Sequence, residues 1–405
     1  MTSRYRQAAR LKDVHYDVRG RNMVEAMRME QAGERILHLN IGNVASFGFH
    51  TPVSMVKSVI AHLQDSEGYC DARGLYSART AVAQYYQNFG IKADVDQIII
   101  GNGVSELISM TLQAMLNSDD EILIPAPDYP LWTAAATLTG ARVVHYLCDE
   151  NNNWAPDCND IEAKITERTK AIVVINPNNP TGAVYDEPTL RQIVSLARTH
   201  GLIVLTDEIY EKIIYRSTHI HLSRLCADDV LCFTFSGLSK AYRACGYRAG
   251  WLMTSGPIES AHDLLEGLGL LANMRMCANV PAQHAIQEAL GGYQSIDELI
   301  APGGRFYDQI DLAYRLLNDI EGVSCTRPDG SLYLFPRLDP QRYPIDDDEE
   351  WALGLLRSHK ILVSHGRGFN WPYPDHFRVV ALPEEAILSE AIGRIAEYCD
   401  QTRRD

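Results

Sequence analysis

Short apolar runs rich in β-branched residues recur along the first 255 positions, and they predict strands at 97–101, 121–125, 142–148, 170–176, 202–207, 230–235 and 250–254. Between several of them lie amphipathic stretches such as 188–200, where apolar residues recur every three or four positions. This alternation favours an α/β fold with a mainly parallel seven-stranded sheet that is covered by helices on both faces. Ligands of such sheets bind beyond the carboxyl ends of the strands.

Three polar segments follow predicted strands: 176–182 (NPNNPTG), 207–210 (DEIY) and 236–240 (SGLSK). Each has a plainer interpretation by itself, because NNPTG is a natural turn sequence and Asp207 is a suitable helix cap. Lys240 alone resembles any solvated surface lysine. Their joint occurrence, each directly after a strand, indicates a common site at one edge of the sheet.

Together these residues offer the groups that pyridoxal phosphate requires. A lysine at the end of a buried strand is costly as an ammonium ion, which suits Lys240 to imine chemistry and to carrying a proton. Asp207 would keep the pyridine nitrogen protonated, while Asn179 and Tyr210 would bond the phenolate oxygen of the ring. Arg248 is expected to bind the phosphate.

Further segments carry a resemblance over residues 13–400: LNIGN at 39–43, GYCDARG at 68–74, GNGVSE at 101–106, PAPDYP at 125–130, ANVPAQH at 278–284 and FRV at 377–379. The chain resembles the class I/II pyridoxal-phosphate-dependent aminotransferases of the aspartate aminotransferase fold, and within them the bacterial glutamate–pyruvate (alanine) group. The resemblance implies fold type I, with a large cofactor-binding domain at 46–295. It also implies a smaller α+β lobe built from 1–45 and 296–405.

The resemblance also makes Gly103, Val104 and Ser105 a phosphate cradle. They lie between the strand at 97–101 and a predicted helix at 105–116, where free backbone N–H groups and the helix dipole favour an anion. An ordinary strand–helix turn is the alternative. The segment is not a dinucleotide fingerprint, because Glu106 occupies the third glycine position.

Two further parts of the cofactor site are predicted less directly. Gly237 stands where many relatives carry a phosphate-binding serine, so Ser236 and Ser239 are both candidates for that contact. Tyr129 resembles the aromatic residue that stacks on the cofactor ring, and Tyr69 resembles a tyrosine that reaches the phosphate of the neighbouring subunit. The resemblance therefore implies a homodimer with shared active sites, although a core aromatic and a turn tyrosine are the plainer interpretations.

For the substrates, Arg378 is expected to pair with the α-carboxylate, helped by the backbone of Gly42 and the amide of Asn179. Tyr16 and Arg19 form a hypothetical N-terminal flap facing the glutamate side chain, and a solvated charge is the alternative for Arg19. The predicted reaction is a ping-pong exchange in which alanine and 2-oxoglutarate give pyruvate and glutamate.

Other functions share some of these features. A lyase acting on cysteine S-conjugates or an aromatic aminotransferase would carry the same cofactor motifs. A regulatory cofactor-binding module is less favoured, because the net charge of −15 opposes contact with nucleic acid or an anionic membrane. A nucleotide-dependent dehydrogenase lacks its glycine pattern here.

The remaining features of the sequence bear on the cellular location and on metal binding. Nine cysteines without CxxC or Cys/His spacing indicate a reduced compartment. The N-terminus lacks the apolar region of a signal peptide, and no run approaches the ~18 apolar residues of a membrane helix. We expect the cytoplasm, no membrane and no metal. The acidic run at 346–350 is interpreted as a solvated helix start.

Overall fold

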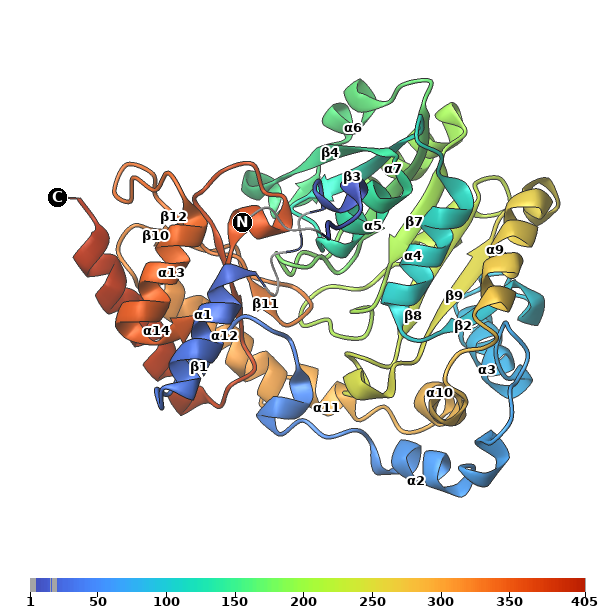
Figure 1. The fold of residues 1–405 in the computed structure, drawn as a ribbon, viewed down its shortest axis with the longest axis horizontal. Helices are drawn as coiled ribbons and strands as arrows, with labels where there is room; N and C mark the ends of the chain where they lie inside the picture. The colour runs from blue at the N-terminus through green and yellow to red at the C-terminus, as the bar shows by residue number, and fades with distance from the viewer. Residues whose placement is uncertain (1–4, 15, 17–19, 405) are drawn as a thin grey trace.

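An eight-stranded sheet forms the centre of the larger part of the molecule (Figure 1), in a computed structural model that describes residues 5–14, 16 and 20–404. Its strands, in spatial order, are β2 (Ile98–Gly101), β9 (Gly250–Ser255), β8 (Cys232–Gly237), β7 (Ile203–Asp207), β6 (Thr169–Ile175), β3 (Glu121–Ala126), β4 (Arg142–Asp149) and β5 (Ala155–Pro156). The neighbours from β8 to β4 pair in parallel. The predicted α/β fold with a mainly parallel sheet is confirmed.

All seven predicted strands are present within two residues of their expected bounds, but the sheet has one strand more. The expectation of seven strands is therefore corrected by β5, which pairs antiparallel with the end of β4. A two-residue strand has no periodicity to detect. Its Pro156 lacks an N–H group, which an edge strand tolerates.

Helices cover both faces of this sheet, because its central strands are apolar on both sides. Every residue of β3 is buried, as are all residues of β6 except Lys170. The covering and peripheral helices are α2 (Val53–Ala61), α3 (Tyr76–Gln87), α4 (Val104–Met115), α5 (Leu131–Thr139), α6 (Cys158–Lys164), α7 (Glu187–His200), α8 (Leu222–Cys226), α9 (His262–Met274), α10 (Val280–Gly291) and α11 (Ile296–Ile300).

The helix predicted at 188–200 shows how local sequence sets the boundaries. It is α7, which begins after Asp186, whose side chain accepts a hydrogen bond from the N–H of Thr189. It ends at Gly201, where φ is +65° and glycine is favoured. Capping and terminator signals thus agree with the apolar spacing.

A second group of elements contains the C-terminal helices and short strands, which lie beside α1 in Figure 1. The helices are α1 (Arg21–Gln31), α12 (Arg305–Asn318), α13 (Asp348–His359) and α14 (Glu385–Thr402). The strands are β1 (Leu37–His38), β10 (Val323–Ser324), β11 (Tyr333–Leu334), β12 (Arg337–Leu338), β13 (Ile361–Leu362), β14 (Ser364–His365) and β15 (Phe377–Val380).

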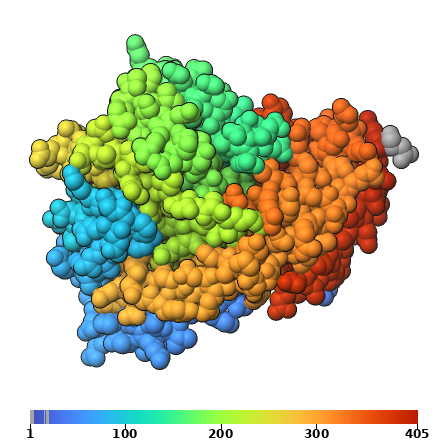
Figure 2. Space-filling view, turned by 180° about the vertical axis from the view of Figure 1, so that it is seen from behind, coloured from blue at the N-terminus to red at the C-terminus, as the bar shows by residue number. Residues whose placement is uncertain are grey.

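The N-terminal segment joins this second group. Strand β1 pairs in parallel with β13, and Met29 of α1 packs in one apolar cluster with Leu353 and Leu356 of α13. Figure 2 shows the C-terminal portion, orange to red, packed against the central part of the chain. These contacts support the two-lobe organisation, while the boundaries at residues 46 and 295 stay a prediction.

Two smaller sequence predictions have a structural outcome here. The acidic run begins helix α13, where the Asp347 carboxylate accepts hydrogen bonds from the N–H groups of Glu349 and Glu350. The helix start is confirmed, but the run is not solvated throughout, because Asp348 is buried and accepts hydrogen bonds from Arg367. Among the described residues, no helix combines the length and apolar character needed to cross a membrane.

Candidate active site

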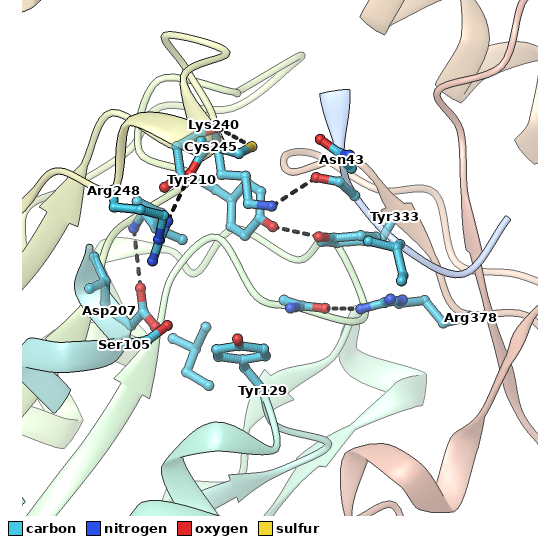
Figure 3. A pocket seen from close by; sticks show the side chains of 18 of the residues that line it. Asn43, Ser105, Tyr129, Asp207, Tyr210, Lys240, Cys245, Arg248, Tyr333 and Arg378 are labelled. Carbon is cyan, nitrogen blue, oxygen red and sulfur yellow. Dashed lines mark hydrogen bonds between the residues drawn. The ribbon is translucent and has the colours of Figure 1, made fainter. Parts of the chain in front are cut away.

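A cavity of about 630 Å³ opens at the carboxyl ends of β6, β7 and β8, where the three polar segments converge (Figure 3). It is lined by residues from the sheet portion and from both ends of the chain: Tyr16, Ile41, Gly42, Asn43, Val104, Ser105, Tyr129, Ile175, Asn179, Asp207, Ile209, Tyr210, Ser239, Lys240, Cys245, Gly246, Arg248, Tyr333 and Arg378. Twelve of the predicted site residues are in this set. The three segments thus meet in one cavity as predicted, while the roles of their residues stay a prediction.

Lys240 follows β8 and points into the cavity (Figure 3). Its Nζ donates a hydrogen bond to the carbonyl of Gly42 at 2.9 Å and lies 6.0 Å from the centre of the Tyr210 ring. The amine is therefore held in place by a backbone oxygen from the N-terminal segment.

Asp207 is the last residue of β7 and is buried at the base of the cavity. Its Oδ2 accepts a hydrogen bond from Nε1 of Trp132 at 3.1 Å, and its Oδ1 accepts one from the N–H of Ile209 at 3.3 Å. Burial raises the pKa of Asp207 to about 6, against the effect of these two bonds. A cationic partner in the cavity would favour the carboxylate form.

Arg378, in β15, is also buried, and burial lowers its pKa. Its Nη1 donates to the Oδ1 of Asn179 at 2.9 Å, and its Nη2 donates to the carbonyl of Asn40. The guanidinium lies 4.3 Å from the ring centre of Tyr333 and 4.5 Å from that of Phe369. Its buried Nε has no hydrogen-bond partner among the described residues, so the group still has a donor to offer an anion.

A second anion site lies at the start of α4. Gly103 precedes the helix with φ of +85°, and Val104 and Ser105 form its first turn facing the cavity. Arg248 packs so closely on Gly103 that a Cβ there would lie 2.2 Å from its Nη2. Its guanidinium bonds the carbonyls of Cys245 and Asn102. The N–H groups at the start of α4 and the guanidinium of Arg248 thus lie next to each other, which is a suitable arrangement for binding a phosphate.

The two serine candidates differ in position. Ser239 lines the cavity, whereas Ser236 is buried in β8 and donates its hydroxyl to Glu211 at 2.9 Å. The structure therefore does not support Ser236 as a phosphate contact, because its hydroxyl is bonded to Glu211 and the residue does not line the cavity. Tyr69 is 80% exposed and lies outside this cavity. Its predicted role in a neighbouring subunit stays a prediction.

At the mouth of the cavity, the hydroxyl of Tyr16 lies 3.2 Å from that of Tyr129. Tyr16 thus lines the cavity, while its predicted contact with the glutamate side chain stays a prediction. Arg19 lies outside the described residues.

Comparison with known proteins shows the family to which the chain belongs. Residues 34–395 match the model of the class I and II aminotransferases. The chain belongs to this family. Enzymes of this family depend on pyridoxal phosphate, so the cofactor prediction is confirmed.

Two proteins of known name and one solved structure are similar to this chain over nearly its whole length. The alanine aminotransferase of Mycobacterium tuberculosis is 57% identical over 398 residues, which are 97% of this chain and 92% of that protein. The glutamate-pyruvate aminotransferase AlaA of Escherichia coli is 53% identical, with 97% of both chains covered. A crystal structure of an aminotransferase from Escherichia coli superposes with a TM-score of 0.98 at 52% identity and covers both chains completely.

Several residues of this aminotransferase site were missed from sequence. Tyr333 lines the cavity and bonds the hydroxyl of Tyr210 at 2.6 Å, and Trp132 bonds Asp207. Asn43 and Cys245 also line the cavity. Tyr333 and Trp132 stand in apolar surroundings typical of a core, so no local signal distinguishes them.

Next to the site lies a cluster of residues of the kinds that bind metals, which the sequence did not predict. Glu208, Glu211, His219 and His221 place ligand atoms within 4.8 Å of one another. Oε2 of Glu208 lies 2.6 Å from His221 Nδ1 and 3.2 Å from His219 Nε2, while its Oε1 accepts two further bonds. Because both oxygens of Glu208 are satisfied, we interpret the cluster as a buried ion-pair network.

Proposed function

We propose that this aminotransferase exchanges amino groups between alanine and 2-oxoglutarate, giving pyruvate and glutamate. The observation that carries the proposal is the cavity itself. It places a lysine amine, a buried acid and an arginine with an uncommitted Nε around one space. The activities named for the relatives at 53% and 57% identity support the choice of substrates.

The residues present fit pyridoxal phosphate. Lys240 would attach it, Asp207 would face its ring nitrogen, and Tyr129 would cover one face of the ring. Asn179 and Tyr210 would bond the phenolate oxygen. The phosphate would lie at the cradle formed by Gly103, Val104, Ser105, Ser239 and Arg248. When bound, the cofactor accepts the electron pair left at the substrate Cα.

The remaining chemistry belongs to the chain's own residues. Arg378 and Asn179 would hold the substrate α-carboxylate, which fixes the orientation of the Cα–H bond. The Nζ of Lys240 would take the proton from Cα and deliver it onward as a general acid and base. The enzyme would keep the amino group between the two half-reactions, which makes the kinetics ping-pong.

Assembly and location follow from the same proposal. A homodimer would bring Tyr69, now exposed, to the phosphate of the partner subunit. Tyr16 would meet the longer substrate, together with Arg19. The nine cysteines are free thiols in the structure, which supports the cytoplasm as the location.

Spectral titration of the purified holoenzyme tests the substrates directly. Alanine or glutamate alone should convert the cofactor absorbance, and pyruvate or 2-oxoglutarate should restore it. Conversion by aromatic amino acids alone would replace the proposed pair with an aromatic one. Release of ammonia and pyruvate from cystathionine without any acceptor would indicate a lyase instead.

A further inference from the structure

Asp128 is a carboxylic acid that the reaction does not use, yet it is fully buried beside the cavity. It lies in the turn between β3 and α5, directly before Tyr129, and its side chain has no exposed surface. Burial of an acid is costly unless its oxygens are hydrogen-bonded. The position therefore calls for an explanation in terms of what the side chain holds together.

Both oxygens of Asp128 have partners, and the partners come from two distant segments. Oδ2 accepts a hydrogen bond from the hydroxyl of Thr133 in α5 at 2.7 Å. Oδ1 accepts one from the amide of Asn370 at 2.7 Å, and the N–H of Asp128 donates to the carbonyl of Phe369 at 2.9 Å. Asp128 thus joins the turn after β3 to the segment that precedes β15.

These two segments carry two different walls of the site, and Figure 3 shows Tyr129 and Arg378 on separate sides of the cavity. Tyr129 follows Asp128 and lines the cavity. Phe369 precedes Asn370, and its ring lies 4.5 Å from the guanidinium of Arg378. A shift of either segment would change the distance between the ring-facing tyrosine and the carboxylate-binding arginine.

We propose that Asp128 is a positioning residue that sets the spacing between Tyr129 and Arg378 and thereby the affinity for substrate carboxylates. This inference rests on the proposed function. The side chain acts through hydrogen bonds across the two segments, so a neutral group of the same shape should serve. Burial raises the pKa of Asp128 to about 7, which is consistent with a role that does not require a charge.

An asparagine can make both of the side-chain bonds described above. Its carbonyl would accept from Asn370, and its NH₂ would donate to Thr133. The Thr133 hydroxyl would then turn to Nε2 of His145, which lies 3.0 Å away. Burial lowers the pKa of His145 to about 4, so its ring is neutral and able to accept. Asp128→Asn is therefore the conservative variant.

Glu121 provides a matched control at the other end of the same strand. It is equally buried and hydrogen-bonded by Thr166 and Arg168, but it lies at the end of β3 away from the cavity. Asp128→Ala and Glu121→Ala should both lower the melting temperature. Only a residue that positions the site should also change ligand binding.

The experiment measures binding of glutarate, an unreactive dicarboxylate, to the holoenzyme by calorimetry, together with steady-state kinetics. Asp128→Ala should weaken glutarate binding and raise KM for 2-oxoglutarate about tenfold, with a smaller change in kcat. Asp128→Asn and Glu121→Ala should bind glutarate like the wild type. Asn370→Gly removes the side-chain bond across the segments, keeps the backbone bond from Asp128 to Phe369, and tolerates the positive φ of this position, so it should shift binding in the same direction.

Unchanged glutarate binding in Asp128→Ala and Asn370→Gly would overturn the proposal. So would equal weakening in Glu121→Ala, or an Asp128→Asn variant as impaired as the alanine variant. A wild type that binds glutarate but does not transfer nitrogen from alanine would refute the proposed function alone, because the binding comparison would remain valid.

Discussion

The amine of Lys240 meets a backbone carbonyl at 2.9 Å. This arrangement holds the side chain toward the cavity without committing it to a permanent charge partner there. A group that must form a bond and then carry a proton needs that freedom.

Replacing Lys240 by Ala should slow proton transfer about 10²–10⁴-fold, because the general acid and base is removed. Single-turnover decay of the cofactor absorbance with alanine measures this step. Lys212→Ala is the control, since Lys212 lies over the ring of Tyr85 outside the cavity and should leave the rate unchanged. Near-normal turnover in Lys240→Ala would remove its proposed role.

Sequence reasoning at this scale succeeded where chemistry-bearing residues follow strands. Lys240, Asp207 and Asn179 all met in one cavity. It failed for Tyr333, because that tyrosine stands in an apolar run and reaches the site only through the pairing of β11 with β15. A contact that depends on the pairing of strands distant in sequence cannot be predicted from the spacing of residues within one segment.

At the scale of elements, the junction of β2 and α4 is a tight packing unit. Gly103 adopts φ of +85°, and Arg248 fills the space where a side chain would lie. The same glycine therefore permits both the turn and the arginine.

Gly103→Ala should weaken cofactor binding about tenfold, because the added methyl group displaces the guanidinium from the cradle. Equilibrium dialysis of the cofactor measures the loss. Gly90→Ala is a matched control, since Gly90 has φ of +74° with nothing within 4 Å of an added Cβ. Equal cofactor affinity in the two variants would contradict the assigned cradle.

The network around Glu208 links β7 to the segment before α8 and should depend on pH. Burial opposes charge on His221, but Glu208 outweighs it, so the pKa of His221 is raised. Burial likewise opposes ionisation of Glu208, but His221 and His219 outweigh it, so the pKa of Glu208 is lowered. The histidine contributes stability that is lost as pH rises through its raised pKa, and the glutamate contributes stability that is lost as pH falls through its lowered one.

His221→Gln should therefore lower the melting temperature most between the ordinary pKa values of 4.5 for glutamate and 6.5 for histidine. The deficit should shrink at alkaline pH, where the wild-type imidazole is neutral. Scanning calorimetry across pH 4–9 measures this profile. His262→Gln, in an exposed pair with Glu266, should show no such profile. A deficit independent of pH would contradict the ionic interpretation.

Elements were predictable in proportion to their length. The seven predicted strands of the large sheet carry continuous apolar runs, and α7 has both its cap and its terminating glycine. Strands of two residues, such as β5 and β11, have no period and are defined only by their partners.

For the whole molecule, the net charge of −15 opposes anionic substrates at long range. Arg378 and Arg248 supply the local compensation inside the cavity. The fold class could be predicted because alternating strands and helices are a global pattern. Tyr69 shows the limit of prediction from a single chain, because its predicted partner lies on another subunit.

A heterodimer of one Tyr69→Ala subunit and one Lys240→Ala subunit tests shared sites. If Tyr69 acts across the interface, one of the two sites is intact and activity should be about half of wild type. Two affinity tags allow purification of the mixed species, and each variant homodimer is the control. Activity no higher than in those homodimers would place Tyr69 within its own subunit or give it no role.

Tyr16 and Arg378 line the same cavity from opposite ends of the chain. The ribosome must therefore release the chain through β15 before the pocket has all its walls. The side chains proposed here for the cofactor all lie at or before Arg248, whereas the arginine proposed for the substrate carboxylate lies in β15. A nascent chain stalled before β15 should therefore lack the substrate anchor even where the cofactor groups are already present.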